Sequence, residues 1–119
     1  MRYPLPEKVK VIAKNAVEPI YTYEDGEQTN IQATDEATGL PMWQVQVSLM
    51  QAGESEDSGK LKFPADESEE FLTTEEIVGE KLRLENGSMK TYSFKTSSGD
   101  SLFGKTFFAT AVTVPGLDY

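Results

Sequence analysis

The side chains with the clearest potential for chemistry are lysines and aromatic residues that lie close together along the chain. Lys90 and Lys95 flank two aromatic residues, and Lys105 precedes Phe107 by two positions. Single-stranded nucleic acids are bound by this combination, because bases stack on rings while cations contact phosphates. The candidate nucleic-acid-binding residues are Lys10, Lys62, Arg83, Lys90, Tyr92, Phe94, Lys95, Lys105 and Phe107.

Most catalytic chemistry is excluded by residue types that the chain lacks. It contains no Cys and no His, which removes thiol nucleophiles, thiolate and imidazole metal ligands, and Ser-His-Asp catalysis. No Gly-rich loop of the kind that cradles phosphates is present. We therefore assign no catalytic residue, no metal ligand and no cofactor, and we predict that the protein is not an enzyme.

Two acidic stretches are the alternative places for a ligand. They run from Gly53 to Gly59 (GESEDSG) and from Pro64 to Glu76 (PADESEEFLTTEE). Divalent cations take oxygen ligands, but neither stretch has the spaced acids and central Gly of a calcium loop. Charge runs usually repel and stay hydrated. We predict solvated acidic loops near 53–59 and 64–76.

The net charge of −9 is distributed unevenly. The segment from Met1 to Tyr23 carries +2, that from Glu24 to Gly79 carries −12, and that from Glu80 to Tyr119 carries +1. Phosphate binding needs Lys and Arg, so the total charge opposes nucleic-acid binding while the distribution permits it. The acidic middle segment offers a second hypothesis, in which carboxylates imitate phosphates and bind a basic protein.

Hydrophobic periodicity predicts strands in most of the chain. Apolar and polar residues alternate with a period of two, as in half-buried strands. The alternating segments are Lys8 to Lys14, Asn30 to Thr34, Trp43 to Leu49, Lys60 to Phe63, Lys81 to Leu84, and Lys105 to Val114. Trp43 shares its face with Val45 and Val47, which predicts a core position. In the final strand the alternation places Phe107 on the outer face with Lys105, and Phe108 on the opposite face.

Turn signals predict how some of these strands are connected. Asn86-Gly87 is a strong two-residue hairpin signal, which predicts that the strand through Leu84 folds back on Met89 to Lys95. The loop from Asp35 to Gly39 predicts a hairpin before the Trp43 strand. One short helix is predicted at Thr73 to Val78, with Thr73 or Thr74 as its cap.

These elements predict one domain over residues 1–119, an all-β small antiparallel barrel with at most one short helix. Barrel closure hides sheet edges that would otherwise aggregate. An OB-like barrel is favoured because the helix falls before the final hairpin. An SH3-like barrel and a small sandwich are the alternatives.

The expected location follows from cysteine usage and hydropathy. The absence of Cys suits a reducing compartment, and no apolar run approaches the roughly 20 residues of a membrane span. The start of the chain is charged and is interrupted by Pro4 and Pro6, unlike a signal peptide. We expect a cytoplasmic protein without a membrane partner.

The segment from Asp35 to Val47 (DEATGLPMWQVQV) resembles small regulatory and replication-accessory proteins of actinobacterial plasmids and integrative elements. These carry a similar D-x-x-T-G-x-P followed by an aromatic residue and alternating valines. Their aromatic-rich final strand after a Gly resembles Gly104 to Val112, and the two matches cover roughly a third of the chain. More distantly, the order of hairpins resembles the filamentous-phage single-strand-binding proteins, which are OB-type dimers.

Three functional hypotheses follow. The first, which the resemblance favours, is a plasmid or phage single-stranded DNA-binding or replication-accessory protein. The second is an acidic inhibitor that mimics nucleic acid and binds a basic host or defence protein. The third is a structural β-domain that binds only protein. A homodimer is compatible with each of them.

Overall fold

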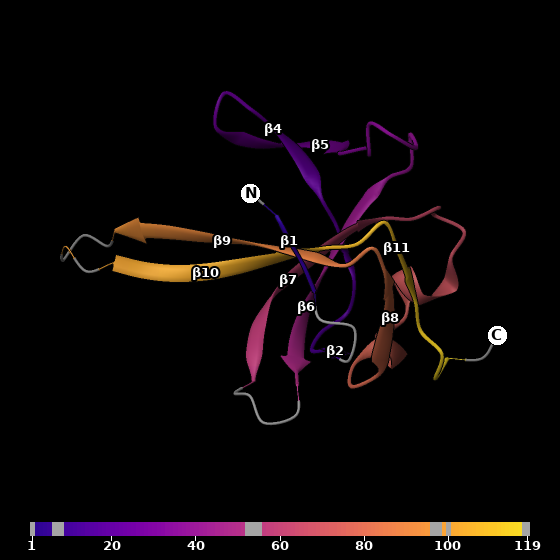
Figure 1. The fold of residues 1–119 in the computed structure, drawn as a ribbon. Helices are drawn as coiled ribbons and strands as arrows, with labels where there is room; N and C mark the ends of the chain where they lie inside the picture. The colour runs from indigo at the N-terminus through magenta and orange to yellow at the C-terminus, as the bar shows by residue number, and fades with distance from the viewer. Residues whose placement is uncertain (1, 6–8, 52–55, 96–98, 100, 118–119) are drawn as a thin grey trace.

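The computed structural model describes residues 2–5, 9–51, 56–95, 99 and 101–117. This part of the chain is mostly β (Figure 1). The strands are β1 (Tyr3–Pro4), β2 (Lys10–Ala13), β3 (Glu18–Pro19), β4 (Tyr21–Glu24), β5 (Glu27–Gln32), β6 (Met42–Met50), β7 (Asp57–Pro64), β8 (Lys81–Glu85), β9 (Ser88–Lys95), β10 (Ser101–Phe108) and β11 (Ala111–Thr113). Two 3-10 helices, η1 (Glu70–Thr73) and η2 (Glu75–Ile77), lie between β7 and β8.

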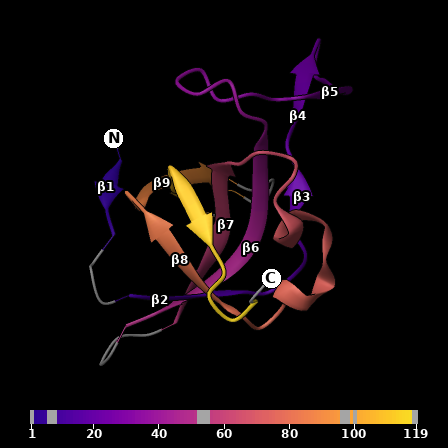
Figure 2. The same cartoon turned by 90° about the vertical axis from the view of Figure 1, so that its right-hand side faces the viewer.

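The main sheet curls strongly into a barrel-like shape (Figure 2), and its two sides meet where the chain passes from β10 to β11. On one side β2 pairs with β6, β6 with β7, and β7 with β10. On the other side β2 pairs with β8, and β8 pairs with β11. The backbone N–H of Ala109 donates to the carbonyl of Lys62, and the next N–H, that of Thr110, donates to the carbonyl of Glu85. Two consecutive residues thus join β7 to β8.

The order of strands in this ring confirms the predicted OB-like barrel. Among the strand pairs of the described residues, β7 and β10 are parallel and the others are antiparallel. The helical connection falls before the final hairpin, as predicted, and it follows β7, the third strand of the ring. It consists of the separate turns η1 and η2, on either side of Thr74, rather than one helix. Of the two proposed caps, Thr74 is the cap of η2, because its hydroxyl accepts a hydrogen bond from the Glu76 N–H at 3.2 Å.

The core fills the barrel with the inward residues of these strands. Its largest fully buried side chains are Phe63, Phe107, Leu61, Ile77, Val45 and Val47. Trp43 is buried, as predicted, and its indole N–H donates to the Ala65 carbonyl at 3.0 Å. The Phe71 ring stacks on Phe63 with 6.1 Å between centroids. The connection between β7 and β8 therefore covers one end of the core.

Two predicted hairpins are wrong in their strand pairing. β8 does not pair with β9 across Asn86-Gly87, because closure of the ring uses β8 to pair with β2 and β11. Asn86, with φ of 51°, instead forms a corner from which β9 leaves to pair with β1 and β10. β5 likewise pairs with β4 rather than with β6. The expected pairing across Asp35 to Gly39 is reduced to one bridge between Thr34 and Pro41.

The β4–β5 hairpin follows from a turn signal that alternation alone does not reveal. Asp25 and Gly26 both have positive φ, at 53° and 82°, as a two-residue hairpin turn of this handedness requires. The hydroxyls of Thr22 and Thr29 lie 2.6 Å apart across the two strands. The hairpin forms its own two-stranded sheet and projects from the barrel (Figure 1).

The final strand is interrupted, which corrects its predicted alternation. Phe107 and Ala109 are buried before the bend, whereas Val112 and Val114 are buried after it. The alternation shifts by one position because the final strand changes its pairing partner at the ring closure, from β7 to β8. Phe107 therefore faces the core and Phe108 faces outward.

The predicted acidic loop near 53–59 is also shorter than expected. Asp57 to Gly59 begin β7 and pair with the end of β6. Gly53 to Ser55 lie outside the described residues. In the second acidic stretch, η1 and η2 bury Phe71, Leu72 and Ile77 while the carboxylates remain exposed.

We predict that Gly59→Ala destabilises the barrel by about 1–3 kcal/mol, the usual cost of overpacking. A Cβ at this position would lie 2.5 Å from the Lys105 carbonyl oxygen and 2.8 Å from the Phe107 ring. Gly87→Ala is the matched control, because its nearest contact at 3.0 Å is the flexible end of Leu5. Its unfolding free energy should change by less than about 0.5 kcal/mol. Urea unfolding measures both, and equal midpoints for the two variants would contradict the tight β7–β10 contact.

Candidate functional site

A groove of about 810 Å³ lies on the outer face of β6, β7 and β10. The β4–β5 hairpin contributes to its lining, and the β9–β10 hairpin leaves the barrel in another direction (Figure 1). β6 and β7 are the second and third strands of the ring. The β4–β5 hairpin lies in the connection between the first and second strands of the ring, β2 and β6. The β9–β10 hairpin follows the fourth strand, β8, and leads into the fifth, which consists of the end of β10 and β11. In OB-folds this strand face and these two connections bind oligonucleotides and oligosaccharides.

The floor of the groove consists of two rungs of paired side chains. Gln46 on β6 lies opposite Lys60 on β7, and Gln44 lies opposite Lys62. All four side chains line the groove, since the intervening residues of both strands face the core. Each rung therefore presents one amide and one ammonium group.

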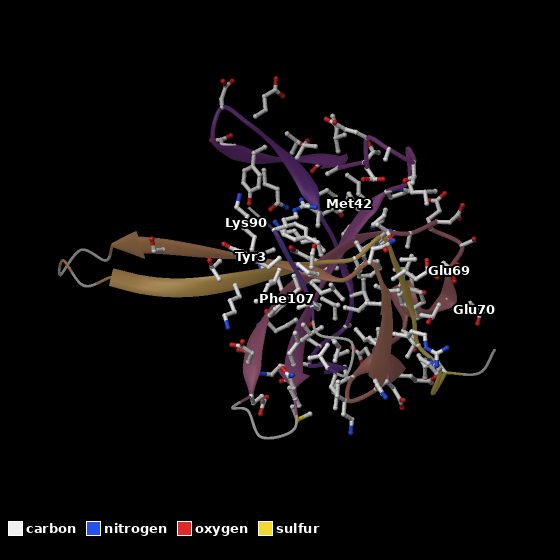
Figure 3. All side chains as sticks on the ribbon, in the orientation of Figure 1. Tyr3, Met42, Glu69, Glu70, Lys90 and Phe107 are labelled. Carbon is white, nitrogen blue, oxygen red and sulfur yellow. The ribbon has the colours of Figure 1, made fainter. Side chains whose placement is uncertain are left out.

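Further cations extend the lysine side of the floor. Thr106 of β10 pairs with Lys60 on one side and with Lys90 of β9 on the other, so Lys90 lies in the same row. Figure 3 shows Lys90 and Phe107 on opposite sides of the β9–β10 ribbon. In the neighbouring row, the guanidinium carbon of Arg2 lies 3.7 Å from the centroid of the Phe108 ring.

The opposite wall is aromatic and polar. Tyr21 and Tyr23 of β4 and Gln28 of β5 line the groove, and Tyr23 is 70% exposed. Glu18 lies on the same side, because it pairs with Gln44 on β6. Neither tyrosine is among the site residues predicted from the sequence, and the register of the β4–β5 pairing shifts between them. The Asp25-Gly26 turn is the signal by which this hairpin could be found.

The structure brings together only some of the predicted site residues. Lys62 lines the groove and Lys90 shares its face, next to Lys60. Lys10 and Arg83 lie on β2 and β8, outside the lining of this groove. The side chains of three predicted residues fall outside what the structure describes, and these residues are Tyr92, Phe94 and Lys95 of β9.

The prediction that Phe107 is an exposed stacking platform is wrong. Phe107 is 0% exposed and packs in the core. Lys105 has the same inward parity, at the end of the barrel where solvent is still accessible. Its ammonium forms an ion pair with the carboxylate of Asp57. Lys105 is among the residues that line the groove, but its charge is already paired with Asp57 across β7 and β10.

The acidic residues form no cation site in the described part of the chain, where no group of three potential ligands is close enough to hold a metal ion. Among the described residues, the carboxyl of Asp66 has a pKa below its ordinary value. The cause is hydrogen bonding from the backbone N–H and the hydroxyl of Ser68. Glu69 and Glu70 lie on the side of the barrel away from Lys90 (Figure 3).

No helix in the described ranges has the length and apolar character needed to cross a membrane. No protein-family model matches the sequence, and no curated protein matches it significantly. The functional interpretation therefore depends on the groove itself.

The corrected positions of the two adjacent phenylalanines make a direct prediction. Phe107→Ala should lower the unfolding free energy by about 3–5 kcal/mol, as removal of a buried Phe does. Phe108→Ala should cost less than about 2 kcal/mol, because Phe108 is half-buried on the outer face under Arg2. Urea denaturation compares the two variants. A larger loss for Phe108→Ala would mean that the β10 alternation is reversed.

Proposed function

We propose that the protein binds single-stranded nucleic acid in the groove over β6 and β7. The observation that supports this most strongly is the row of cations beside an exposed aromatic wall, on the strand face that OB-folds use for ligands. The protein would act as a single-stranded DNA-binding protein of a plasmid or phage, as the sequence resemblance implies. The groove itself supports the nucleic-acid class and does not depend on that resemblance.

The phosphate contacts in this proposal come from Lys60, Lys62 and Lys90. Lys60 and Lys90 are exposed and Lys62 is half-buried, so these ammonium groups are open to a ligand on one face. Each phosphate that a lysine neutralises releases counterions, which makes binding salt-dependent. Three contacts on a single strand predict a log-log slope of about −2, at about −0.7 per contact.

The stacking contact in this proposal comes from Tyr23. Its ring is among the most exposed large apolar groups of the described residues, at 70%, and it lines the groove. An exposed aromatic residue beside a cationic strand face gives a base a surface on which to stack, whatever the base identity. Tyr21 is half-buried in the same wall and supports the hairpin below Tyr23.

The acidity of the protein limits the affinity that we expect. The net charge of −9 repels phosphates at long range, although Glu18 is the one acid among the described residues that line the groove. We expect dissociation constants of about 10⁻⁴ to 10⁻⁶ M at physiological salt, the range of nonspecific binding.

Removal of the groove lysines should weaken binding and flatten its salt dependence. The variant K60A/K62A should lower the magnitude of the salt slope by about 1.4, or 0.7 per lost phosphate contact. K10A/K81A is the matched control, because it removes the same charge from the outer face of β2 and β8. Fluorescence anisotropy with a labelled oligothymidylate across salt concentrations measures both. Equal slopes for the two double variants would contradict binding at the groove.

Removal of the Tyr23 ring should weaken binding without a change in salt slope. Tyr23→Ala should cost about 1–3 kcal/mol of binding free energy, the usual effect of losing one stacked base. Ile31→Ala is the control on the same hairpin, since Ile31 is 67% exposed and does not line the groove. The same anisotropy titration should give wild-type affinity for Ile31→Ala. If Tyr23→Ala also bound with wild-type affinity, no base would stack on this residue.

The acidic-inhibitor hypothesis has a separate supporting observation. Exposed carboxylates on and beside η1 and η2 gather at the end of the barrel away from Lys90, and they include Glu67, Glu69, Glu70, Glu75 and Glu76. A surface of this kind suits a basic protein partner. No detectable binding of the folded protein to any oligonucleotide at low salt would favour this second function.

A further inference from the structure

The two sides of the groove differ in chemistry in a way that fixes how a nucleic-acid strand would lie. On the β7 side are the ammonium groups of Lys60 and Lys62, and on the β6 side are the amides of Gln44 and Gln46. The amide side continues into the tyrosine wall of the β4–β5 hairpin. A single strand has the same asymmetry, with charged phosphates along one edge and flat, hydrogen-bonding bases along the other.

We infer that the groove contacts the unpaired edges of bases through three glutamine amides, Gln28, Gln44 and Gln46, while phosphates lie over the β7 lysines. This inference rests on the proposed single-strand binding and adds the orientation of the strand and its selectivity against duplex. The juxtaposition that carries it is the placement of each floor amide directly opposite a lysine.

The three amides are available for a ligand. They converge on the groove from β5 and β6, and among the described residues no hydrogen bond involves their side-chain atoms. Gln32 differs from them, because its amide donates to the Met42 carbonyl at 2.9 Å. Its bond fixes the base of the β4–β5 hairpin, whereas the groove amides have no side-chain hydrogen bond to another described residue.

An amide suits the hydrogen-bonding edge of any base. The NH₂ group and the carbonyl oxygen of an amide complement an adjacent acceptor and donor on a base. Gln makes two such hydrogen bonds to the N7 and N6 atoms of adenine. The pairing edge of every base offers at least one donor beside an acceptor. In a duplex those edges are occupied by the complementary strand, so the amides would favour single strands without selecting one sequence.

Glu18 supports the same orientation. It lies on β3 opposite Gln44, at the amide side of the groove, and it is exposed. A carboxylate there repels phosphates and accepts hydrogen bonds from exocyclic amines of bases. The two rungs are two residues apart along each strand, about 7 Å, so each rung can serve a different nucleotide of an extended strand.

The test separates base contacts from phosphate contacts. The variant Q44M/Q46M removes both floor amides with little change in side-chain length, and Q51M is the control, because Gln51 is exposed just beyond β6 and does not line the groove. Anisotropy is measured with an oligothymidylate of about 12 nucleotides, within the usual site size of an OB-fold. The same length of abasic oligonucleotide supplies phosphates without bases, and a duplex supplies bases with occupied edges.

The wild type and Q51M should bind the oligothymidylate about tenfold or more tightly than the abasic strand and the duplex. Q44M/Q46M should lower that preference several-fold and keep the part that stacking on Tyr23 supplies, with unchanged affinity for the abasic strand and an unchanged salt slope, because no charge is removed. Q28M removes the amide in the tyrosine wall and should lower the preference in part. It tests base contact even if the floor variant does not fold. Folding of each variant is checked by its urea midpoint.

Failure of base contact by the amides can be distinguished from failure of the proposed single-strand binding. If the wild type binds oligothymidylate and Q44M/Q46M and Q28M retain its full preference over the abasic strand, base contact by the amides is wrong while single-strand binding stands. Equal wild-type affinity for the normal and abasic strands would likewise contradict base contact. If the wild type binds no oligonucleotide, the proposed function fails, and the inference fails with it.

Discussion

The parallel contact between β7 and β10 is the constraint on which the rest of the structure depends. It brings the end of the chain against its middle, and it is tight enough that only Gly fits at position 59, under the Lys105 carbonyl and the Phe107 ring. Immediately after this contact, Ala109 and Thr110 connect β7 to β8 through successive backbone hydrogen bonds. Without this contact β7 would pair only with β6 and its other edge would be unpaired, a situation that sheet proteins avoid.

The closure also determines which side chains are available for function. Because β10 joins β7 with Phe107 inward, Thr106 continues the row of Lys60 toward Lys90 on the outer face. The β4–β5 hairpin has no pairing partner in the ring, so it stands beside this row and supplies Tyr23. The lysines of β7 and the tyrosines of β4 line the same groove because the β4–β5 hairpin does not pair with the strands of the ring. The exposed carboxylates of η1 and η2 lie at another end of the barrel, away from the lysines of the groove.

Local patterns predict the strands and the OB-like barrel, because the alternation of apolar and polar residues depends only on near neighbours in sequence, such as Trp43, Val45 and Val47. They do not predict which strands pair, since Asn86-Gly87 has the chemistry of a hairpin turn but the ring takes both edges of β8. The same limit explains Phe107. Its face depends on a one-position shift at the ring closure, where hydrogen bonds join residues 47 and 25 positions apart in sequence. The lysine side of the site was therefore partly predictable, whereas the tyrosine and glutamine side required the fold.

We propose that single-stranded nucleic acid binds across β6 and β7 rather than elsewhere on the barrel. An NMR titration of ¹⁵N-labelled protein with oligothymidylate tests this most directly, because each backbone amide reports on its own surroundings. Binding in the groove should give the largest shift changes at Gln44, Gln46, Lys60, Lys62 and Tyr23, with little change at Lys10, Lys81 and Arg83. Changes concentrated in β2 and β8, or no changes at low salt with the protein folded, would contradict it.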